Sequence, residues 1–356
     1  MDKKRTSQKP LPSKGITSAP LEMQEGRAPA TFIVPDLIPG RAVVSPFSII
    51  RQGTATNELS KQIIVPGAKF DLDPFTGVAS INRGGFQLSF INPNEFTGLK
   101  GSTHRLLDAL IMVFTENGSR DKTVRIPLRE YMELCGLKDI KETRRQVNAD
   151  LWTLRQMSIT FTDKTSGIDR NYVNVSIAQA HGIANSVIAL TWGDVFYDIL
   201  RDSPTMPLHR LIFRLNPRLR PHSRPLFRKI QAHKRINAGK PSEDTLSVTT
   251  LLSVCPEMPT YEKVMTGNRN LYDLIIRPFE ENMDALEEAL SWEYCHTNGT
   301  PLTEEELAAF TYEIFITLLV KTTWRDYPDQ TALIEAKSKR RANAERRKAA
   351  SKKGKK

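Results

Sequence analysis

Basic and amide side chains are concentrated in two short segments of the sequence, and their types are suited to binding nucleic acid. The first segment, residues 140–157, holds Lys141, Arg144, Arg145 and Asn148. The second segment, residues 260–277, holds Lys263, Asn268, Arg269, Asn270, Tyr272 and Arg277. Arginine and asparagine carry paired hydrogen-bonding groups that fit guanine and adenine edges in the major groove. The second segment is therefore interpreted as a base-contacting site.

The first segment is interpreted differently, because three of its four candidate residues are cationic. Contacts to phosphate position a protein on DNA without distinguishing one sequence from another. Lys164 and Arg170 are weaker candidates for backbone contact, since Asp163 and Asp169 offset their charge. Each set also has a plainer interpretation. Charges on one helix face can simply be solvated, and residues 268–270 can be a loop or capping cluster beside Gly267.

The sequence shows no pattern typical of an enzyme that acts on nucleic acid. A nickase of the rolling-circle type needs two histidines separated by one residue to hold a metal, together with a nucleophilic tyrosine. All six histidines are isolated: His104, His181, His209, His222, His233 and His296. No GxxxxGK[ST] loop and no CxxC pair occurs, and the acidic residues form no compact constellation. We therefore expect a protein that is not an enzyme, with no catalytic residues, no metal site and no cofactor.

The first basic segment is predicted to lie on a helix. Asp139 precedes Glu142 by three residues, a capping-box pattern that starts a helix running to about Met157. Ile140, Val147, Leu151 and Leu154 form one apolar stripe along it, so the cations fall mostly on other faces. A half-buried strand at 124–128 and a short helix at 129–135 precede it, and a hairpin at 159–177 follows.

A further helix at 102–117 comes first, and residues 187–192 and 194–200 supply one more strand and helix. The order helix, strand, two helices and hairpin is that of a winged helix, in which the second helix of the pair enters the major groove. The fold class is therefore predicted as α+β.

The same order recurs further along the chain. It comprises a helix from Ser223, a strand at 245–248, a short helix to Cys255, a longer helical stretch from Thr260, and a hairpin of 290–296 with 312–320. We interpret this recurrence as an internal duplication, giving two tandem winged-helix domains. The alternative is two unrelated α+β regions, because few residues are identical between the two copies.

Charge is spread very unevenly along the 356 residues. The formal net charge is +11, but residues 336–356 carry +10 and residues 1–14 carry +4, which leaves −3 for residues 15–335. The folded part is therefore not basic overall, and any nucleic-acid site in it must be local. The basic tail is interpreted either as a non-specific nucleic-acid arm or as a solvated disordered end.

These patterns predict five segments. They are a disordered N-terminal arm (1–58), a small β segment packing on the first domain (59–100), winged-helix domain 1 with phosphate contacts (101–205), winged-helix domain 2 for sequence-specific DNA binding (206–326), and a basic disordered tail (327–356). Within the arm, residues 46–51 are an apolar island able to dock elsewhere. Cys135, Cys255 and Cys295 suggest no disulfide framework, and neither a signal peptide nor a membrane span is evident. We expect a soluble, cytoplasmic protein.

Three stretches resemble the plasmid replication initiators of the theta-type Rep family. They are HRLLDALIMVF, IPLREYMELCGLKDIKETRRQVNADLWTLRQMSITF and YEKVMTGNRNLYDLIIRPFEENMDALEEAL, within residues 100–325. The resemblance implies binding to double-stranded DNA at repeated origin sites, opening of an AT-rich segment, recruitment of host replication proteins and a monomer–dimer equilibrium. It also implies dimerisation and phosphate contact by domain 1 (101–205) and base contacts by domain 2 (206–326). The chain departs from the family pattern in two places. Gly267 lies inside the presumed second recognition helix, and an inserted segment at 303–306 is expected to form a short capped helix.

Two alternatives to an initiator remain open. One is a transcriptional repressor of a phage or plasmid operon with the same fold, and the other is a nuclease whose site is not visible in the sequence. A repressor is usually smaller and does not need two different winged helices, which favours the initiator.

Overall fold

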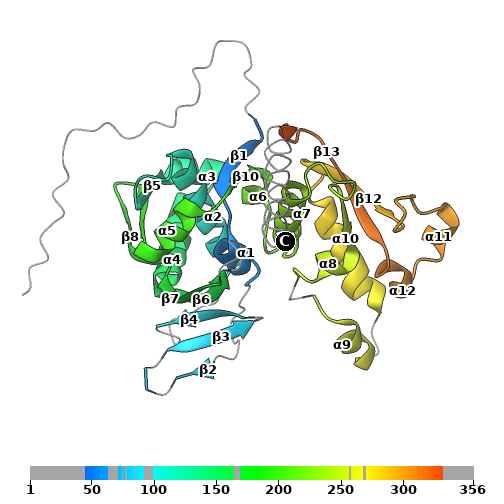
Figure 1. The fold of residues 1–356 in the computed structure, drawn as a ribbon, viewed down its shortest axis with the longest axis horizontal. Coiled ribbons are helices and arrows are strands. Elements are labelled where there is room, and N and C mark those ends of the chain that lie inside the picture. The colour runs from blue at the N-terminus through cyan, green and yellow to red at the C-terminus, as the bar shows by residue number, and fades with distance from the viewer. Residues whose placement is uncertain are drawn as a thin grey trace, which may run out of the picture. The chain divides into compact units, whose positions relative to one another are not determined.

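The computed structural model describes residues 45–62, 71–91 apart from 74, 77 and 84, 99–163, 169–255, 258–267 and 270–331. These residues have the predicted α+β fold, with helices packed against small antiparallel sheets (Figure 1). Residues 1–44 of the predicted arm, residues 332–356 of the predicted tail and the 63–70 and 92–98 connections lie outside the described residues.

The predicted boundary of the disordered arm at residue 58 is wrong. Residues Phe47–Arg51 form strand β1, which pairs antiparallel with β10 (Thr205–His209), and Thr54–Ser60 form helix α1. Ile50 is fully buried, which agrees with the prediction that the apolar residues 46–51 dock against another part of the chain. The strand partner lies more than 150 residues away, so local composition could not reveal it. The predicted domain boundary at 205/206 also falls inside β10.

The first helical unit contains a three-stranded sheet and four helices. Its elements are α2 (Gly101–Glu116), β5 (Thr123–Pro127), α3 (Leu128–Cys135), α4 (Ile140–Gln156), β8 (Ala178–Ala184), β9 (Val187–Trp192) and α5 (Asp194–Asp202). The strand order is β5-β9-β8. Gly136 ends α3 with a left-handed φ of 64°, and the Asp139 carboxylate accepts a hydrogen bond from the Glu142 amide to begin α4.

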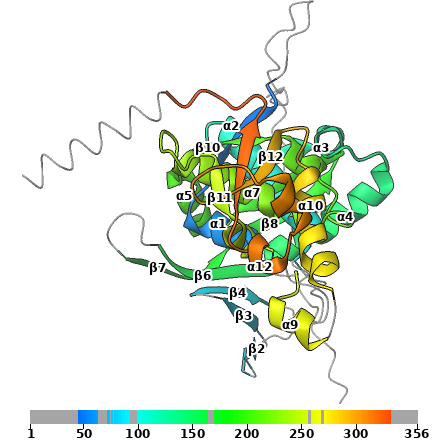
Figure 2. The same ribbon diagram turned by 90° about the vertical axis from the view of Figure 1, so that its right-hand side faces the viewer.

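The hairpin that completes this sheet is not the predicted one. Strands β6 (Met157–Asp163) and β7 (Arg170–Ser176) do pair, but in a separate five-stranded sheet with order β2-β3-β4-β6-β7. Its other strands are β2 (Asp71–Leu72), β3 (Ala79–Arg83) and β4 (Phe86–Phe90), which form the predicted small β segment (Figure 2). Because β4 pairs with β6, the hairpin beside β5 is β8–β9 instead.

The second helical unit repeats this topology. It contains α7 (Ser223–Ile236), β11 (Thr245–Ser247), α8 (Val248–Leu252), α9 (Tyr261–Thr266), the π-helix η2 (Tyr272–Ile276), α10 (Arg277–Asp284), β12 (Leu290–Cys295) and β13 (Leu319–Trp324). Its strand order, β11-β13-β12, matches β5-β9-β8 position for position. Helix α6 (Leu211–Arg214) lies between the two units, and α11 (Glu304–Ala308) is the predicted short capped helix.

Two boundaries in the second unit differ from the prediction. Residues Tyr312–Phe315 form helix α12 rather than part of a strand, because Thr311 caps the turn and Phe315 is fully buried within it. The pairing partner of β12 is therefore the later β13. Gly267 is the residue that ends α9, not an interior residue, so the expected glycine penalty within a helix does not arise.

A buried carboxylate joins the first helices of the two units. Asp108 of α2 accepts hydrogen bonds from Arg224 and, at 2.5 Å, from Arg228, both on α7. Arg224 also donates to the main-chain oxygen of His104 at 2.9 Å. Burial alone would raise the pKa of Asp108, but the charges of Arg228 and Arg224 outweigh it and lower that pKa. The carboxylate is therefore ionised and paired in the folded protein.

We predict that Asp108→Asn destabilises the protein by about 3–5 kcal/mol, because it leaves two buried guanidinium groups without a counter-charge. Urea unfolding of the full chain measures the loss. Asp202→Asn is the matched control, since Asp202 pairs with Arg201 on the surface, where such pairs contribute about 0–1 kcal/mol. Equal small losses in both variants would contradict the prediction.

A second buried carboxylate joins α2 to α4. Asp150 Oδ1 accepts hydrogen bonds from the hydroxyls of Ser102 and Thr103 and from the Gln146 amide. Asp150 Oδ2 is buried and has no hydrogen-bond partner among the described residues. Burial is the main cause that raises the pKa of Asp150 to about 6, and the three donors only partly oppose it. The ionised form is therefore costly at neutral pH.

We predict that Asp150→Asn stabilises the protein at pH 7.5 by on the order of 2–3 kcal/mol relative to the parent, and that the gain disappears near pH 4. The sign follows from the raised pKa. The pKa of Asp150 is about 6 in the folded protein, against an ordinary value of 3.8. The protonated carboxyl group therefore does not destabilise the fold, and the free energy of unfolding falls as the pH rises from about 4 to about 6 and the group ionises. Urea unfolding of both proteins at the two pH values tests this, and a pH-independent difference would refute it.

Candidate nucleic-acid interface

Helix α4 presents one cationic face to solvent, as predicted from the residue spacing. Besides Glu142, five of its polar side chains are exposed: Lys141, Arg144, Arg145, Asn148 and Arg155. We call this set the α4 face. The opposite side of the helix is anchored by Val147, Leu151 and Leu154, which are all buried. The α4 face is therefore held rigidly by the core and is free to contact a polyanion.

The β8–β9 hairpin flanks the α4 face on one side. The Arg144 guanidinium donates a hydrogen bond to the Ser186 hydroxyl at 3.0 Å, and Ser186 lies at the turn between the two strands. Further along α4, the Trp152 ring packs edge-on against His181 of β8 at a centroid distance of 5.9 Å. Burial and the nearby charge of Arg155 lower the pKa of His181, so this imidazole is neutral at pH 7. Helix α4 and the adjacent hairpin thus form one continuous surface.

Arg145 is partly neutralised by its own helix. Its guanidinium donates two hydrogen bonds to the Glu142 carboxylate, at 2.9 and 2.8 Å. These bonds are the chief cause that lowers the pKa of Glu142, and the charge of Arg218 adds to the effect. The pair is well exposed, so its contribution to folding stability is small. Its main consequence is for binding, because a phosphate group must compete with Glu142 for Arg145.

Three predicted residues of the second segment lie on three different short helices. Exposed Lys263 lies on α9, whereas Tyr272 begins η2 and Arg277 begins α10. The Asn270 side-chain oxygen accepts a hydrogen bond from the Tyr272 amide, and its amide donates to Asp273, so Asn270 caps the helix start. The capping interpretation of this residue is therefore the one that the contacts support. Asn268 and Arg269 lie outside the described residues.

The N-terminal end of η2 and α10 is the only part of this helix pair suited to DNA among the described residues. Arg277 lies there, 3.4 Å from Asp273, and Tyr272 is 46% exposed. Further along α10 the charged side chains are all acidic: Asp284 is exposed, Glu281 is partly exposed, and Glu280 is partly buried against Tyr294. These carboxylates would repel phosphates, so a DNA contact here is confined to the first turns.

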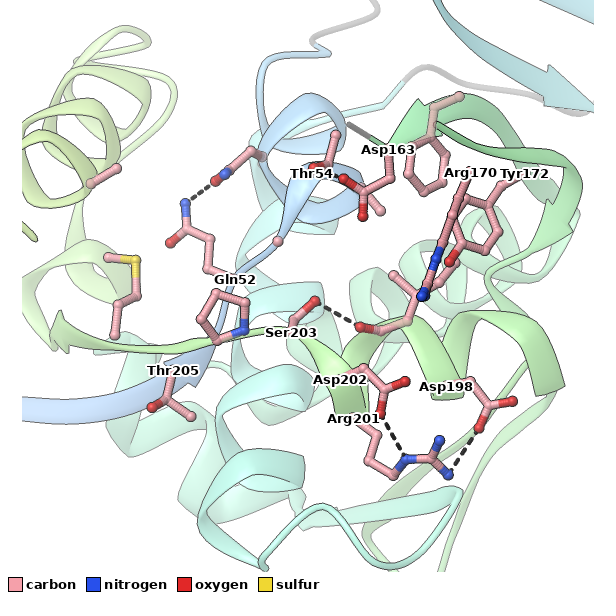
Figure 3. Close-up of a pocket in the computed structure, with 18 of the residues that line it drawn as sticks. Gln52, Thr54, Asp163, Arg170, Tyr172, Asp198, Arg201, Asp202, Ser203 and Thr205 are labelled. Carbon is pink, nitrogen blue, oxygen red and sulfur yellow. Dashed lines mark hydrogen bonds and ion pairs between the residues drawn. The ribbon is translucent and has the colours of Figure 1, made fainter. Parts of the chain in front are cut away.

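The β6–β7 hairpin holds two predicted residues, Lys164 and Arg170. Lys164 lies outside the described residues, and Arg170 lines a cavity of about 760 Å³ (Figure 3). Three carboxylates and three guanidinium groups line this cavity: Asp163, Asp198, Asp202, Arg170, Arg201 and Arg235. Arg201 is paired with both Asp198 and Asp202, at 3.0 and 3.1 Å. The cavity is electrically balanced and does not extend the α4 face.

Three residues of the interface were missed by the sequence prediction. They are Trp152, His181 and Ser186, which link α4 to the β8–β9 hairpin. Trp152 follows Asn148 by four residues, so the helical period alone places it on the polar face and could have identified it. The other two could not be found, because their position depends on which hairpin pairs with β5.

Two negative findings concern the part of the chain that the structure describes. Within it, no three histidine, cysteine or acidic side chains come close enough together to hold a metal ion. No helix there is both long and apolar enough to cross a membrane.

Comparison with known proteins gives likenesses of fold only. No family model and no curated protein matches the sequence. Two crystal structures of domains 2 and 3 of RctB are similar in fold. One covers 77% of this chain and 99% of its own, with a TM-score of 0.41 and 9% identity, and the other covers 75% and 96%, with a TM-score of 0.34 and 8% identity. At these values the likeness carries no argument about function, which therefore rests on the geometry above.

We predict that Glu142→Gln strengthens binding to any DNA duplex by about two- to fivefold at low salt, because it removes a negative charge and releases Arg145 for phosphate. Fluorescence anisotropy with a labelled duplex measures the change. The control is Glu58→Gln, since Glu58 pairs with Lys61 in the same three-residue spacing on α1, far from the α4 face in sequence. A gain in the control as large as that in Glu142→Gln would show that only net charge matters.

Proposed function

We propose that this chain is a DNA-binding replication initiator that recognises repeated sites at a plasmid or mobile-element origin. The observation that carries the proposal is the α4 face, a rigid cationic helix surface flanked by the β8–β9 hairpin. The same element order in the second unit supplies a second candidate recognition helix, η2 with α10. Two such units on one chain suit a long binding site, and the resemblance to theta-type Rep proteins points in the same direction.

The two units have different roles in this proposal. The α4 face, with Lys141, Arg144 and Arg145, contacts phosphates and positions the protein, whereas Arg277 and Tyr272 contact base edges together with Asn268 and Arg269. Binding of several copies to repeated sites opens an adjacent AT-rich segment and recruits host replication proteins. We propose that the protein acts in the cytoplasm, in a monomer–dimer equilibrium, through binding rather than catalysis.

We predict that Arg144→Glu with Arg145→Glu weakens DNA binding about equally on all sequences. The slope of log affinity against log salt should fall by about 0.9 for each phosphate that the variant no longer neutralises. The control with the same charge change is Arg120→Glu with Lys122→Glu, two exposed residues in the turn before β5. Titration at four salt concentrations with origin and random duplexes measures both quantities. Unchanged binding in the α4 variant would remove the basis of the proposal.

A transcriptional repressor is the second candidate, because an interface of this kind also suits operator binding. The discriminating substrate is a supercoiled plasmid that carries direct repeats of about 20 base pairs beside an AT-rich tract, taken from the neighbourhood of the coding gene. An initiator makes thymines of the tract reactive to permanganate, whereas a repressor protects only the repeats. Metal-dependent cleavage of the same DNA would instead favour a nuclease.

A further inference from the structure

The loop between α6 and α7 lies between the two candidate recognition helices. On one side, the Arg220 guanidinium donates a hydrogen bond to the Glu281 carboxylate of α10 at 2.9 Å. On the other side, Arg218 lies near the start of α4, close enough for its charge to act on Glu142. Residues 216–221, which we call the linker loop, therefore pair with α10 through Arg220 and place the charge of Arg218 near the start of α4.

The linker loop has a defined conformation. The Asn216 side-chain oxygen accepts a hydrogen bond from the Arg218 amide at 2.9 Å, and the Arg220 amide donates to the Asn216 main-chain oxygen at the same distance. Pro217 packs against Gly101 so closely that a Cβ on Gly101 would lie 2.6 Å from the Pro217 Cβ. Arg105 fixes the start of the loop with a 2.8 Å hydrogen bond to the Leu215 main-chain oxygen. The tip of the loop is thus preorganised by α2.

Two side chains at the tip are turned to solvent. Leu219 is 71% exposed, and Arg218 is exposed as well. The neighbouring arginines are engaged, since Arg220 pairs with Glu281 and Arg214 lies 3.9 Å from Glu288. No acidic side chain among the described residues lies within ion-pair distance of Arg218. Arg218 therefore has its charge available, beside an exposed apolar side chain on an ordered turn, to contact an anionic ligand.

The nature of that ligand follows from the position of the loop. If α4 and the η2–α10 pair enter successive major grooves, as the proposed function requires, the minor groove between them faces the segment that connects the two units. Minor grooves of A·T tracts are narrow and have a strongly negative potential that attracts arginine, and apolar side chains accompany such contacts against sugars and base edges. Arg218 and Leu219 provide this pair of side chains.

We propose that the linker loop is a third DNA contact, in which Arg218 enters the minor groove between the two recognition helices and Leu219 packs against its wall. This inference rests on the proposed function. It adds a preference for A·T pairs at the centre of the binding site, at a position that neither recognition helix touches.

The test uses the full chain and two duplexes of about 30 base pairs that differ only at the centre, where one has an A-tract and the other alternating G·C pairs. We expect the parent protein to prefer the A-tract duplex. Arg218→Ala should weaken binding to that duplex about fivefold or more and abolish the preference. The matched control is Arg120→Ala, because Arg120 is an exposed arginine in the turn beyond the opposite end of α2.

Each other outcome is decisive. An equal loss on both duplexes would make Arg218 a phosphate contact and overturn the minor-groove assignment, and so would an unchanged preference. If Arg218→Ala has no effect while Arg144→Glu with Arg145→Glu weakens binding, the proposed contact of the linker loop with DNA is wrong and the proposed function stands. If neither variant changes binding, the proposed function fails as well. A thermal unfolding curve that matches the parent excludes a folding defect in Arg218→Ala.

Discussion

The buried contact of Asp108 with Arg224 and Arg228 is the constraint on which the arrangement of the two units depends. Three charges out of water carry a large desolvation cost, which only close pairing offsets. The partners lie on α2 and α7, the equivalent first helices of the two units, so the contact fixes one helix against the other. Since α4 packs on α2 through Asp150, and α10 packs beside α7, the distance between the two candidate recognition helices is set by this cluster.

The same contact limits how the protein can be divided. The domain boundary predicted at 205/206 separates Asp108 from both arginines and cuts β1 from most of β10. A fragment ending there would hold an unpaired buried charge and an open sheet edge, and such an edge promotes non-native association. A test of the predicted monomer–dimer equilibrium therefore needs the whole chain, and dimerisation of a 101–205 fragment would not establish it.

Much of the local structure could be predicted from the sequence, because helix caps and side-chain periodicity are local signals. Asp139 before α4 and Gly136 after α3 are examples, and they placed the cationic face of α4 correctly. The pairing of strands could not be predicted, because the alternation of apolar and polar residues in β6 is compatible with a place in either sheet. Without the β8–β9 hairpin neither His181 nor Ser186 could be assigned to the site. Helical spacing likewise places Arg224 and Arg228 on the polar faces of α7, although both are buried.

The two units share a topology but differ in the charge of the helix that corresponds to α4. The α4 face has four cations against Glu142 and is about 20 Å long from Lys141 to Arg155. On α10 the acidic side chains begin at Glu280, and two of the carboxylates that follow pair with arginines of α6 and the linker loop. Under the proposed function, a duplex bound along α4 would therefore approach the second unit at the start of η2 and α10. Its path would pass the linker loop, where Arg218 has no acidic side chain within ion-pair distance among the described residues, whereas Arg214 and Arg220 are paired.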